Sequence, residues 1–341
     1  MQYLKNNRRT ISKEINSIES RSQYSSDIQR MLFALSPGTE VLFIEAVGNM
    51  GDILASIGSL RNFKERYMHL SLVFAIQEKF LPLIENNRFI TRGFGYTFGM
   101  DTYDYAVVFD LSAICSEWES RNFPDITETR PEILNKYLEL PEKEKYTSFY
   151  QVSENEKRVA DQFLKERNLQ DKKLVGIALK SAELYKDYPI EKYETVVRTF
   201  QDRKEVHFLI FDQSIEVTWP YKNYTSIYGL NIREVAALLQ RCSCLITVDS
   251  GLLHLAGVLI IPIIFLYGIS SWEARTKYYK AINISSKLDC IPCWRGKDQR
   301  CKKLSEKDIM HRSVCMEEIK VVEITEAILR IIDERGCTCS R

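Results

Sequence analysis

Four cysteines near the end of the chain have the spacing of a metal site. Cys290 and Cys293 are two residues apart, and with Cys301 and Cys315 they form the pattern C-x2-C-x7-C-x13-C. Thiolates at such spacing can surround zinc or iron in a tetrahedron. The residues between them, 294–300, are polar and basic, so a metal would supply folding energy that the loop lacks. We expect a closed structural site, and unliganded or disulfide-bonded cysteines are the alternative.

A second candidate site lies where an apolar segment, Leu245–Val248, meets Asp249-Ser250-Gly251. Ser250 or Asp249 can cap the helix that follows, and the free N–H groups of its first turn favour an anion such as phosphate. An ordinary capped helix is the alternative. His254 lies three residues into this helix and either faces the anion or is a hydrogen-bonded core histidine.

Two charged residues follow other predicted strands. Asp52 ends the glycine-containing turn 48–52, where a carboxylate is either a helix N-cap or a general base for a hydroxyl group. Lys186 lies in the loop after the predicted strand Leu174–Ala178. It either neutralises a phosphate group or is a solvated surface lysine.

The elements that must position these residues alternate between strand and helix, which predicts α/β architecture with parallel sheets. The predicted strands are 41–44, 70–76, 105–110, 174–178, 206–211, 245–248 and 261–266. The predicted helices are 53–63, 153–168, 190–200, 232–240, 251–259 and 319–333. The pattern restarts after residues 140–170, so we expect two doubly wound halves, with ligands at the carboxyl ends of their strands.

Length and composition agree with this architecture. A chain of 341 residues predicts about two domains. The 47 basic and 46 acidic residues are balanced, which argues against a large nucleic-acid surface. The nine cysteines are unevenly placed, which suggests a reducing compartment. The longest apolar run, Leu252–Tyr267, contains His254 and Pro262, so we expect no membrane span and a cytoplasmic protein.

Together, these segments resemble glycosyltransferase family 9, the ADP-heptose:lipopolysaccharide heptosyltransferases. The resemblance covers about residues 40–330. The segments that carry it, in the family's order, are Gly48–Leu54, Lys186–Pro189, Val248–Leu255 and Leu266–Gly268. The pattern from Cys290 to Cys315-Met316 is similar to a subset that glycosylates bacterial autotransporter proteins and holds iron at such a site.

The resemblance implies the GT-B fold, in which two Rossmann-like doubly wound domains face each other across a cleft. The expected organisation is an N-terminal extension at 1–38, an acceptor domain at 39–155, a nucleotide-sugar domain at 156–318 that includes the cysteine loop at 288–316, and a helix with a tail at 319–341 that crosses back to the first domain.

The resemblance also assigns the reacting groups. Asp52 would deprotonate an acceptor hydroxyl for in-line attack with inversion, and Lys186 would neutralise the leaving diphosphate. Ser250, Gly251 and Leu252 would bind that diphosphate through hydroxyl and backbone N–H groups.

Other donor-binding roles follow from the same comparison. Asp249 would fix the turn or contact the sugar, and His254 would support the diphosphate loop. Ser181 is expected near the phosphates, and Glu216 is the candidate acid for the ribose. No catalytic divalent metal is expected, since Lys186 and the helix end would replace it.

The expected activity is transfer of heptose from ADP-heptose to lipopolysaccharide, another saccharide or a protein hydroxyl, at the inner face of a membrane or free in the cytoplasm. A UDP- or GDP-linked donor, and a catalytically silent scaffold that binds nucleotide sugars, are the alternatives. An NAD-dependent oxidoreductase is disfavoured because Gly48 and Gly51 do not form G-x-G-x-x-G. Whether the chain forms a homo-oligomer stays open.

Overall fold

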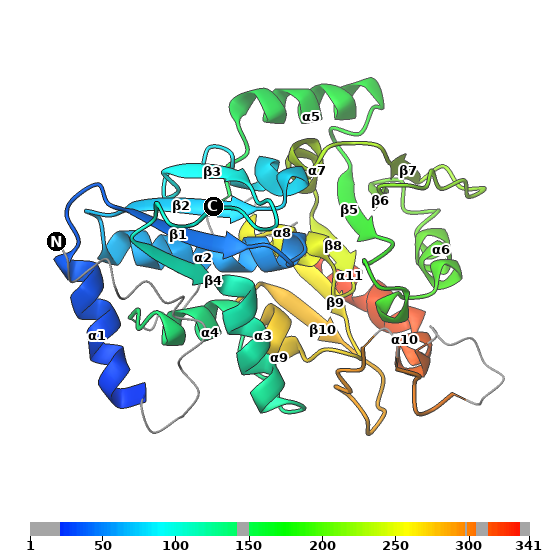
Figure 1. Cartoon of the computed structure of the whole chain (residues 1–341). Helices are drawn as coiled ribbons and strands as arrows, with labels where there is room; N and C mark the ends of the chain where they lie inside the picture. Colours follow the sequence, from blue (N-terminus) through cyan, green and yellow to red (C-terminus); the bar gives the residue numbers. More distant parts are fainter. Residues whose placement is uncertain (1–20, 142–149, 297–298, 305–312, 335–341) are drawn as a thin grey trace. The chain divides into compact units, whose positions relative to one another are not determined.

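The structure is a computed structural model that describes residues 21–141, 150–296, 299–304 and 313–334. The chain divides into two compact units (Figure 1). The first comprises residues 1–121 and 130–149, and the second comprises residues 122–129 and 150–341. The boundaries that the sequence suggested at 38, 155 and 318 remain predictions, as does the return of the last helix to the first domain.

The first unit is built on a four-stranded parallel sheet with the order β3-β2-β1-β4. The strands are β1 (Glu40–Glu45), β2 (Ser71–Ile76), β3 (Arg92–Gly95) and β4 (Val107–Asp110). Strand β1 lies in the middle and is buried from Val41 to Glu45, so its carboxyl end delivers the chain into the turn before α2.

Helices and one 3-10 segment connect and cover these strands. They are α1 (Arg21–Ala34), α2 (Met50–Arg66), η3 (Glu78–Ile84), α3 (Leu111–Asn122) and α4 (Arg130–Tyr137). Helix α2 packs against α4, and its apolar residues from Ile53 to Phe63 are buried. Phe63 meets Phe43 of β1 edge to face at a centroid distance of 4.8 Å, which fixes the helix on the sheet.

The second unit has a six-stranded parallel sheet with the order β10-β9-β8-β5-β6-β7. The strands are β5 (Lys173–Ala178), β6 (Val206–Phe211), β7 (Tyr224–Ile227), β8 (Cys244–Thr247), β9 (Ile263–Leu266) and β10 (Ala281–Ile284). Strand order reverses between β5 and β8, and a ligand site is expected at such a switch point.

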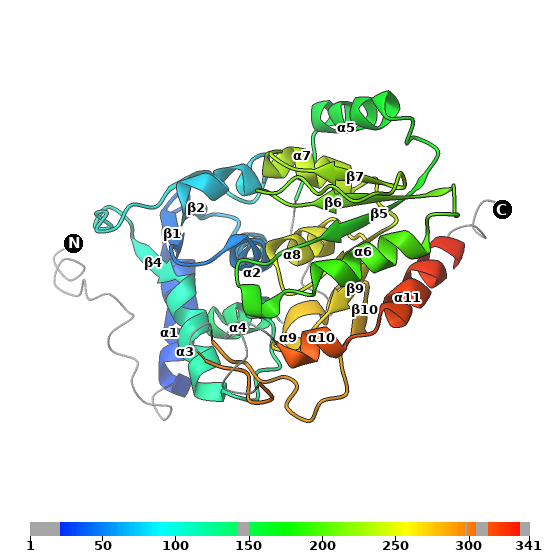
Figure 2. The same ribbon diagram turned by 90° about the vertical axis from the view of Figure 1, so that its right-hand side faces the viewer.

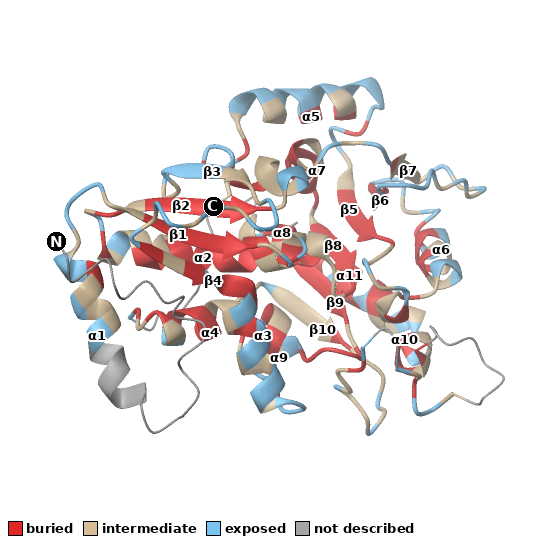
Figure 3. Cartoon of the chain, in the orientation of Figure 1, coloured by how far each residue is buried: buried red, intermediate tan, exposed pale blue. Residues whose placement is uncertain are grey.

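The helical segments of the second unit are α5 (Glu154–Glu166), η4 (Leu184–Lys186), α6 (Ile190–Thr199), α7 (Ile232–Leu239), α8 (Gly251–Val258), α9 (Trp272–Thr276), α10 (Val314–Glu318) and α11 (Val321–Glu334). Helix α11 packs against α6 (Figure 2) and also contacts β9 and β10. Figure 3 shows that burial is concentrated in the central strands of each unit. No helix among the described residues is long and apolar enough to cross a bilayer.

All seven predicted strands are present, and the α/β class is confirmed. Three strands were missed, β3, β7 and β10, and each lies at the edge of its sheet. Their side chains are largely exposed or half-buried, whereas β1, β5, β6 and β8 are buried almost throughout. An edge strand therefore lacks the continuous apolar run by which a central parallel strand is recognised.

Candidate functional site

The turn after β1 brings Asp52 into contact with an arginine that the sequence analysis did not single out. Asp52 Oδ1 lies 2.8 Å from Arg130 Nη1, and Arg130 also donates to Glu119 from Nε at 3.0 Å. The other carboxylate oxygen, Oδ2, accepts the backbone N–H of Asn49 at 2.7 Å and so stabilises the start of α2. One carboxylate oxygen of Asp52 therefore caps the start of α2, and the other pairs with Arg130.

A second carboxyl group lies buried beneath this turn. Glu45 ends β1, is fully buried, and accepts hydrogen bonds from the hydroxyl groups of Ser112 and Ser56. Burial raises the pKa of Glu45, and the charge of Asp52 adds to this effect, whereas the Ser112 hydrogen bond and Arg130 oppose it. The two neighbouring carboxyl groups thus have different environments, one ion-paired and one desolvated.

Gly48 makes this arrangement possible. A Cβ atom at Gly48 would lie 2.4 Å from Glu45 Oε1 and 2.8 Å from Asp52 Cβ, so only glycine fits between the two acidic residues. The glycine in the turn therefore reflects close packing around two acidic side chains.

In the second unit, the residues predicted to bind a donor converge around Asp249. Its Oδ2 atom lies 3.2 Å from Lys186 Nζ and 3.2 Å from Arg275 Nε. Lys186 also pairs with Glu183 at 2.9 Å. Asp249 follows β8, Lys186 ends η4 in the loop after β5, and Arg275 lies on α9, so three separate segments supply this ion-pair cluster.

The cluster keeps its charges at neutral pH. Burial alone would raise the pKa of Asp249, but Arg275, Lys186 and His254 more than offset it and hold that pKa well below its usual range. Burial likewise disfavours the charged form of Lys186, yet Asp249 and Glu183 raise its pKa overall. Two cations therefore stay ionised beside one carboxylate.

The start of α8 adjoins this cluster. Ser250 is the N-cap residue, its hydroxyl accepts the backbone N–H of Leu253 at 3.4 Å, and it lies 2.8 Å from the hydroxyl of Thr247. Gly251 and Leu252 begin the helix, and the N–H groups of a first helical turn have no partner within the helix. The capped-helix interpretation is thus correct, and it is compatible with binding of an anion at the same end.

His254 is half-buried, and its Nδ1 atom lies 3.0 Å from the hydroxyl of Tyr279. A Cβ atom at Gly257, one turn along α8, would lie 2.5 Å from the Tyr279 ring, so this glycine admits the tyrosine. Its electrostatic interaction with Asp249 contributes to the lowered pKa of that carboxylate. His254 therefore stabilises the charge of Asp249 from its position on α8.

Two predicted donor-binding residues, Ser181 and Glu216, form hydrogen bonds with residues other than Asp249. Ser181 is occupied locally, because its hydroxyl donates to the Glu183 carbonyl at 2.7 Å and accepts the Glu183 N–H at 3.1 Å. Glu216 is exposed and bonds Tyr228. Within the described part of the chain, no ion pair joins Glu216 to Lys186.

The four cysteines of the predicted metal loop lie near one another in the second unit. Burial raises the pKa of the Cys315 thiol to about 12, and the thiols of Cys293, Cys301 and Cys290 contribute. All seven described cysteines are free. The thiol chemistry and proximity fit a soft metal ion, but among the described residues no group of three or more side chains is arranged to hold one.

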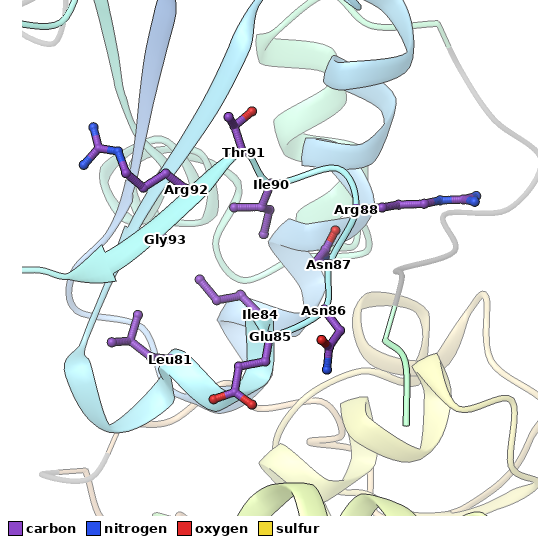
Figure 4. A pocket seen from close by; sticks show the side chains of 10 residues that line it. All are labelled: Leu81, Ile84, Glu85, Asn86, Asn87, Arg88, Ile90, Thr91, Arg92 and Gly93. Carbon is purple, nitrogen blue, oxygen red and sulfur yellow. The ribbon is translucent and has the colours of Figure 1, made fainter. Parts of the chain in front are cut away.

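A surface hollow of about 490 Å³ lies elsewhere in the first unit, between η3 and β3 (Figure 4). Its lining residues are Leu81, Ile84, Glu85, Asn86, Asn87, Arg88, Ile90, Thr91, Arg92 and Gly93. None of the residues discussed above lines it, so this hollow is separate from both clusters.

Comparison with known proteins identifies the class. Residues 88–304 match the family profile "Glycosyltransferase family 9 (heptosyltransferase)", and the chain belongs to this family. The matched segment contains Lys186, Asp249 and Arg275, and it begins after Asp52. A sequence comparison with curated proteins finds no match.

Solved structures give the same fold. E. coli ADP-heptose lps heptosyltransferase II is 16% identical, with a TM-score of 0.63 and coverage of 88% of this chain and 100% of that one. TibC, a bacterial iron-containing dodecameric glycosyltransferase from enterotoxigenic E. coli, is 14% identical, with a TM-score of 0.64 and coverage of 88% and 77%. A family 9 glycosyltransferase from Veillonella parvula is 18% identical, with a TM-score of 0.61 and coverage of 74% and 87%. The chain therefore has the GT-B fold of two Rossmann-like units.

The raised pKa of Glu45 predicts a pH-dependent stability. An unfolded glutamate titrates near pH ~4.3, and the folded pKa is higher, so protonated Glu45 stabilises the protein fully below that pH. This contribution is lost as pH rises through the folded pKa. Glu45→Gln cannot ionise, so its free energy of unfolding should rise relative to that of wild type as pH rises through this window. Urea denaturation at a series of pH values measures this, and a constant difference between the two proteins would contradict it.

The packing of Cys315 predicts the effect of a loop glycine. A Cβ atom at Gly268 would lie 2.5 Å from Cys315 Sγ, so Gly268→Ala must displace this thiol and should cost about 1–3 kcal/mol of stability. Gly296→Ala is the matched control, because its Cβ would meet no atom within 4 Å. Chemical denaturation compares the two variants, and equal stability would show that Cys315 is not held where the structure places it.

Proposed function

We propose that the protein is an inverting glycosyltransferase that transfers heptose from ADP-heptose to a hydroxyl group of a saccharide or protein. The observation that carries this proposal is the cluster of Lys186, Arg275 and Asp249 beside the N-terminus of α8. Two cations and a helix N-terminus form a site for a diphosphate. E. coli heptosyltransferase WaaC, solved with ADP, has the same fold at 13% identity and a TM-score of 0.53.

In the proposed reaction, the acceptor oxygen attacks the anomeric carbon as the bond from that carbon to the diphosphate oxygen breaks. Asp52 takes the acceptor's proton, and the diphosphate leaves with the bonding electron pair. Lys186, Arg275 and the N–H groups of Gly251 and Leu252 stabilise the charge that develops on the leaving group.

Arg130 positions Asp52 for this role. The ion pair holds the Asp52 side chain in place, and two hydrogen bonds to Glu119 hold the guanidinium group of Arg130. The buried Glu45 supports the turn without adding a second exposed charge next to the base. An acceptor hydroxyl would replace part of the Arg130 contact at Asp52 Oδ1.

The four cysteines would hold iron or zinc as a structural ion. Cys290, Cys293, Cys301 and Cys315 supply thiolate ligands, and a metal bound there would fix a loop whose residues are mostly polar. The iron-containing relative TibC supports this assignment.

A thermal-shift titration with ADP, UDP, GDP and ADP-heptose, with NAD as the control, tests the donor. Selective stabilisation by ADP and ADP-heptose supports the heptosyltransferase, since a ligand at about 100 times its Kd stabilises the native state by about 2.7 kcal/mol. Stabilisation by UDP or GDP alone would replace the donor but keep the mechanism. No shift with any nucleotide would contradict the proposed donor site.

Substitution of the base tests the chemistry. Asp52→Asn should reduce transfer by about 100-fold or more, because the general base is lost, while nucleotide binding persists. Asp110→Asn is the matched control, since Asp110 is an aspartate at the carboxyl end of β4 in the same sheet and accepts a helix N–H, from Ala113 at 2.9 Å. Steady-state transfer assays compare the variants, and near-normal activity of Asp52→Asn would exclude Asp52 as the base.

Loss of one thiolate tests the metal assignment. Cys293→Ser should lower the metal content per chain and the melting temperature, because one of four ligands is removed. Cys115→Ala, a buried cysteine in the first unit, is the control for general effects of cysteine loss. Elemental analysis measures both variants, and a full metal complement in Cys293→Ser would refute its role as a ligand.

A further inference from the structure

The cysteine loop reaches the ion-pair cluster through the two residues that follow Cys293. Trp294 has a φ of 48°, in the left-handed region that non-glycine residues seldom adopt, and its N–H donates to the Ile269 carbonyl at 2.8 Å. A conformation of this kind costs about 1–3 kcal/mol and persists only where surrounding contacts enforce it. The loop backbone is therefore held so that the indole ring has one defined place.

That place is against Arg275. The Arg275 guanidinium carbon lies 5.1 Å from the centroid of the Trp294 ring, within the range of a cation–π contact. The same guanidinium pairs with Asp249 through Nε. An arginine stacked on an aromatic face presents its N–H edge in the plane, which suits carboxylate or phosphate oxygens. Trp294 thus fixes the plane of one of the two cations.

Arg295 reaches the other cation by a different route. It is buried, and its guanidinium carbon lies 5.0 Å from the centroid of the Tyr185 ring. The Tyr185 hydroxyl donates to Glu183 at 2.5 Å, and Glu183 pairs with Lys186. The contacts therefore run from the loop to Lys186 through two intervening side chains.

Arg295 is also bound to the loop from two sides. It donates to the Gln299 carbonyl at 2.6 Å and to the Ser313 hydroxyl at 2.5 Å, and that hydroxyl in turn donates to the Tyr185 carbonyl. Ser313 lies two residues before Cys315. Both ends of the cysteine loop therefore converge on the same tyrosine.

We propose that Trp294 and Arg295 are positioning residues of the donor site, through which the segment that follows Cys293 sets the orientation of Arg275 and Lys186 for a diphosphate. This inference rests on the proposed function. It makes the loop part of donor recognition as well as a source of stability. Coupling of this kind is reciprocal, so a bound nucleoside diphosphate must stabilise the loop by the same factor by which the loop improves binding.

The first test measures ADP affinity by calorimetry and transfer kinetics. Trp294→Leu keeps apolar bulk but removes the aromatic face, and it should weaken ADP binding by roughly 3- to 30-fold. Trp294→Phe keeps an aromatic face and should restore most of this affinity. Lys303→Ala is the matched control in the same loop, because Lys303 pairs with the exposed Asp289 and contacts neither donor-site cation.

The outcomes separate the inference from the proposed function. If wild type binds none of ADP, UDP and GDP, the proposed function fails. If wild type binds ADP and Trp294→Leu binds it as tightly as Lys303→Ala does, the positioning role of Trp294 is overturned. Restored affinity in Trp294→Phe supports the role, because Phe again offers an aromatic face to Arg275 whereas Leu does not.

A second measurement needs no variant and covers the case in which Trp294→Leu does not fold. Saturating ADP should slow amide hydrogen exchange at Trp294, whose N–H donates to the Ile269 carbonyl, because ADP favours the state in which this contact is made. The N–H of Ala113, which donates to Asp110 in the first unit, is the internal control and should exchange at an unchanged rate. Equal exchange at Trp294 with and without ADP would overturn the proposed coupling.

Discussion

The candidate donor site depends on one pairing, that of the parallel strands β5 and β8 in the middle of the six-stranded sheet. Their register, with Val175 opposite Cys244, places the ends of both strands at the same edge. The chain leaves β5 into the loop that carries Lys186, and it leaves β8 into Asp249 and the start of α8. A lysine and an aspartate more than sixty residues apart in sequence thereby form an ion pair at 3.2 Å. Without this pairing, Lys186 would keep Glu183 and Asp249 would keep Arg275, but the two pairs would not form one cluster.

Asp249 offsets the repulsion between the two cations that would bind a diphosphate. Two cations beside a helix N-terminus repel each other when no ligand is bound, and the depressed pKa of Asp249 shows how strongly Arg275 and Lys186 stabilise the charge between them. The carboxylate therefore keeps both cations ionised and in place. Two further contacts add directional constraints that charge alone does not provide. Arg275 lies over the Trp294 ring. Glu183, which pairs with Lys186, accepts a hydrogen bond from the Tyr185 hydroxyl.

The first unit shows how one residue can satisfy two competing interpretations. An aspartate after a strand is either a helix-capping residue or a general base, and Asp52 uses separate oxygens for the helix start and for Arg130. The glycine before it leaves room for Glu45, and burial raises the pKa of that carboxyl group. Capping therefore orients the carboxylate and does not argue against a chemical role.

The sequence by itself determined the α/β class, the central strands, and the positions of Asp52, Lys186 and the Asp249–His254 segment. These features can be read from the sequence because continuous apolar runs, glycine turns and helix starts are local patterns along the chain. The edge strands β3, β7 and β10 escaped because half-exposed strands carry no such run. Tertiary structure alone decided the partners: Arg130 for Asp52, Arg275 for Asp249, and Trp294 for Arg275. Each pair joins segments distant along the chain, and only the parallel order of the strands and the path of the loops brings their side chains within contact distance.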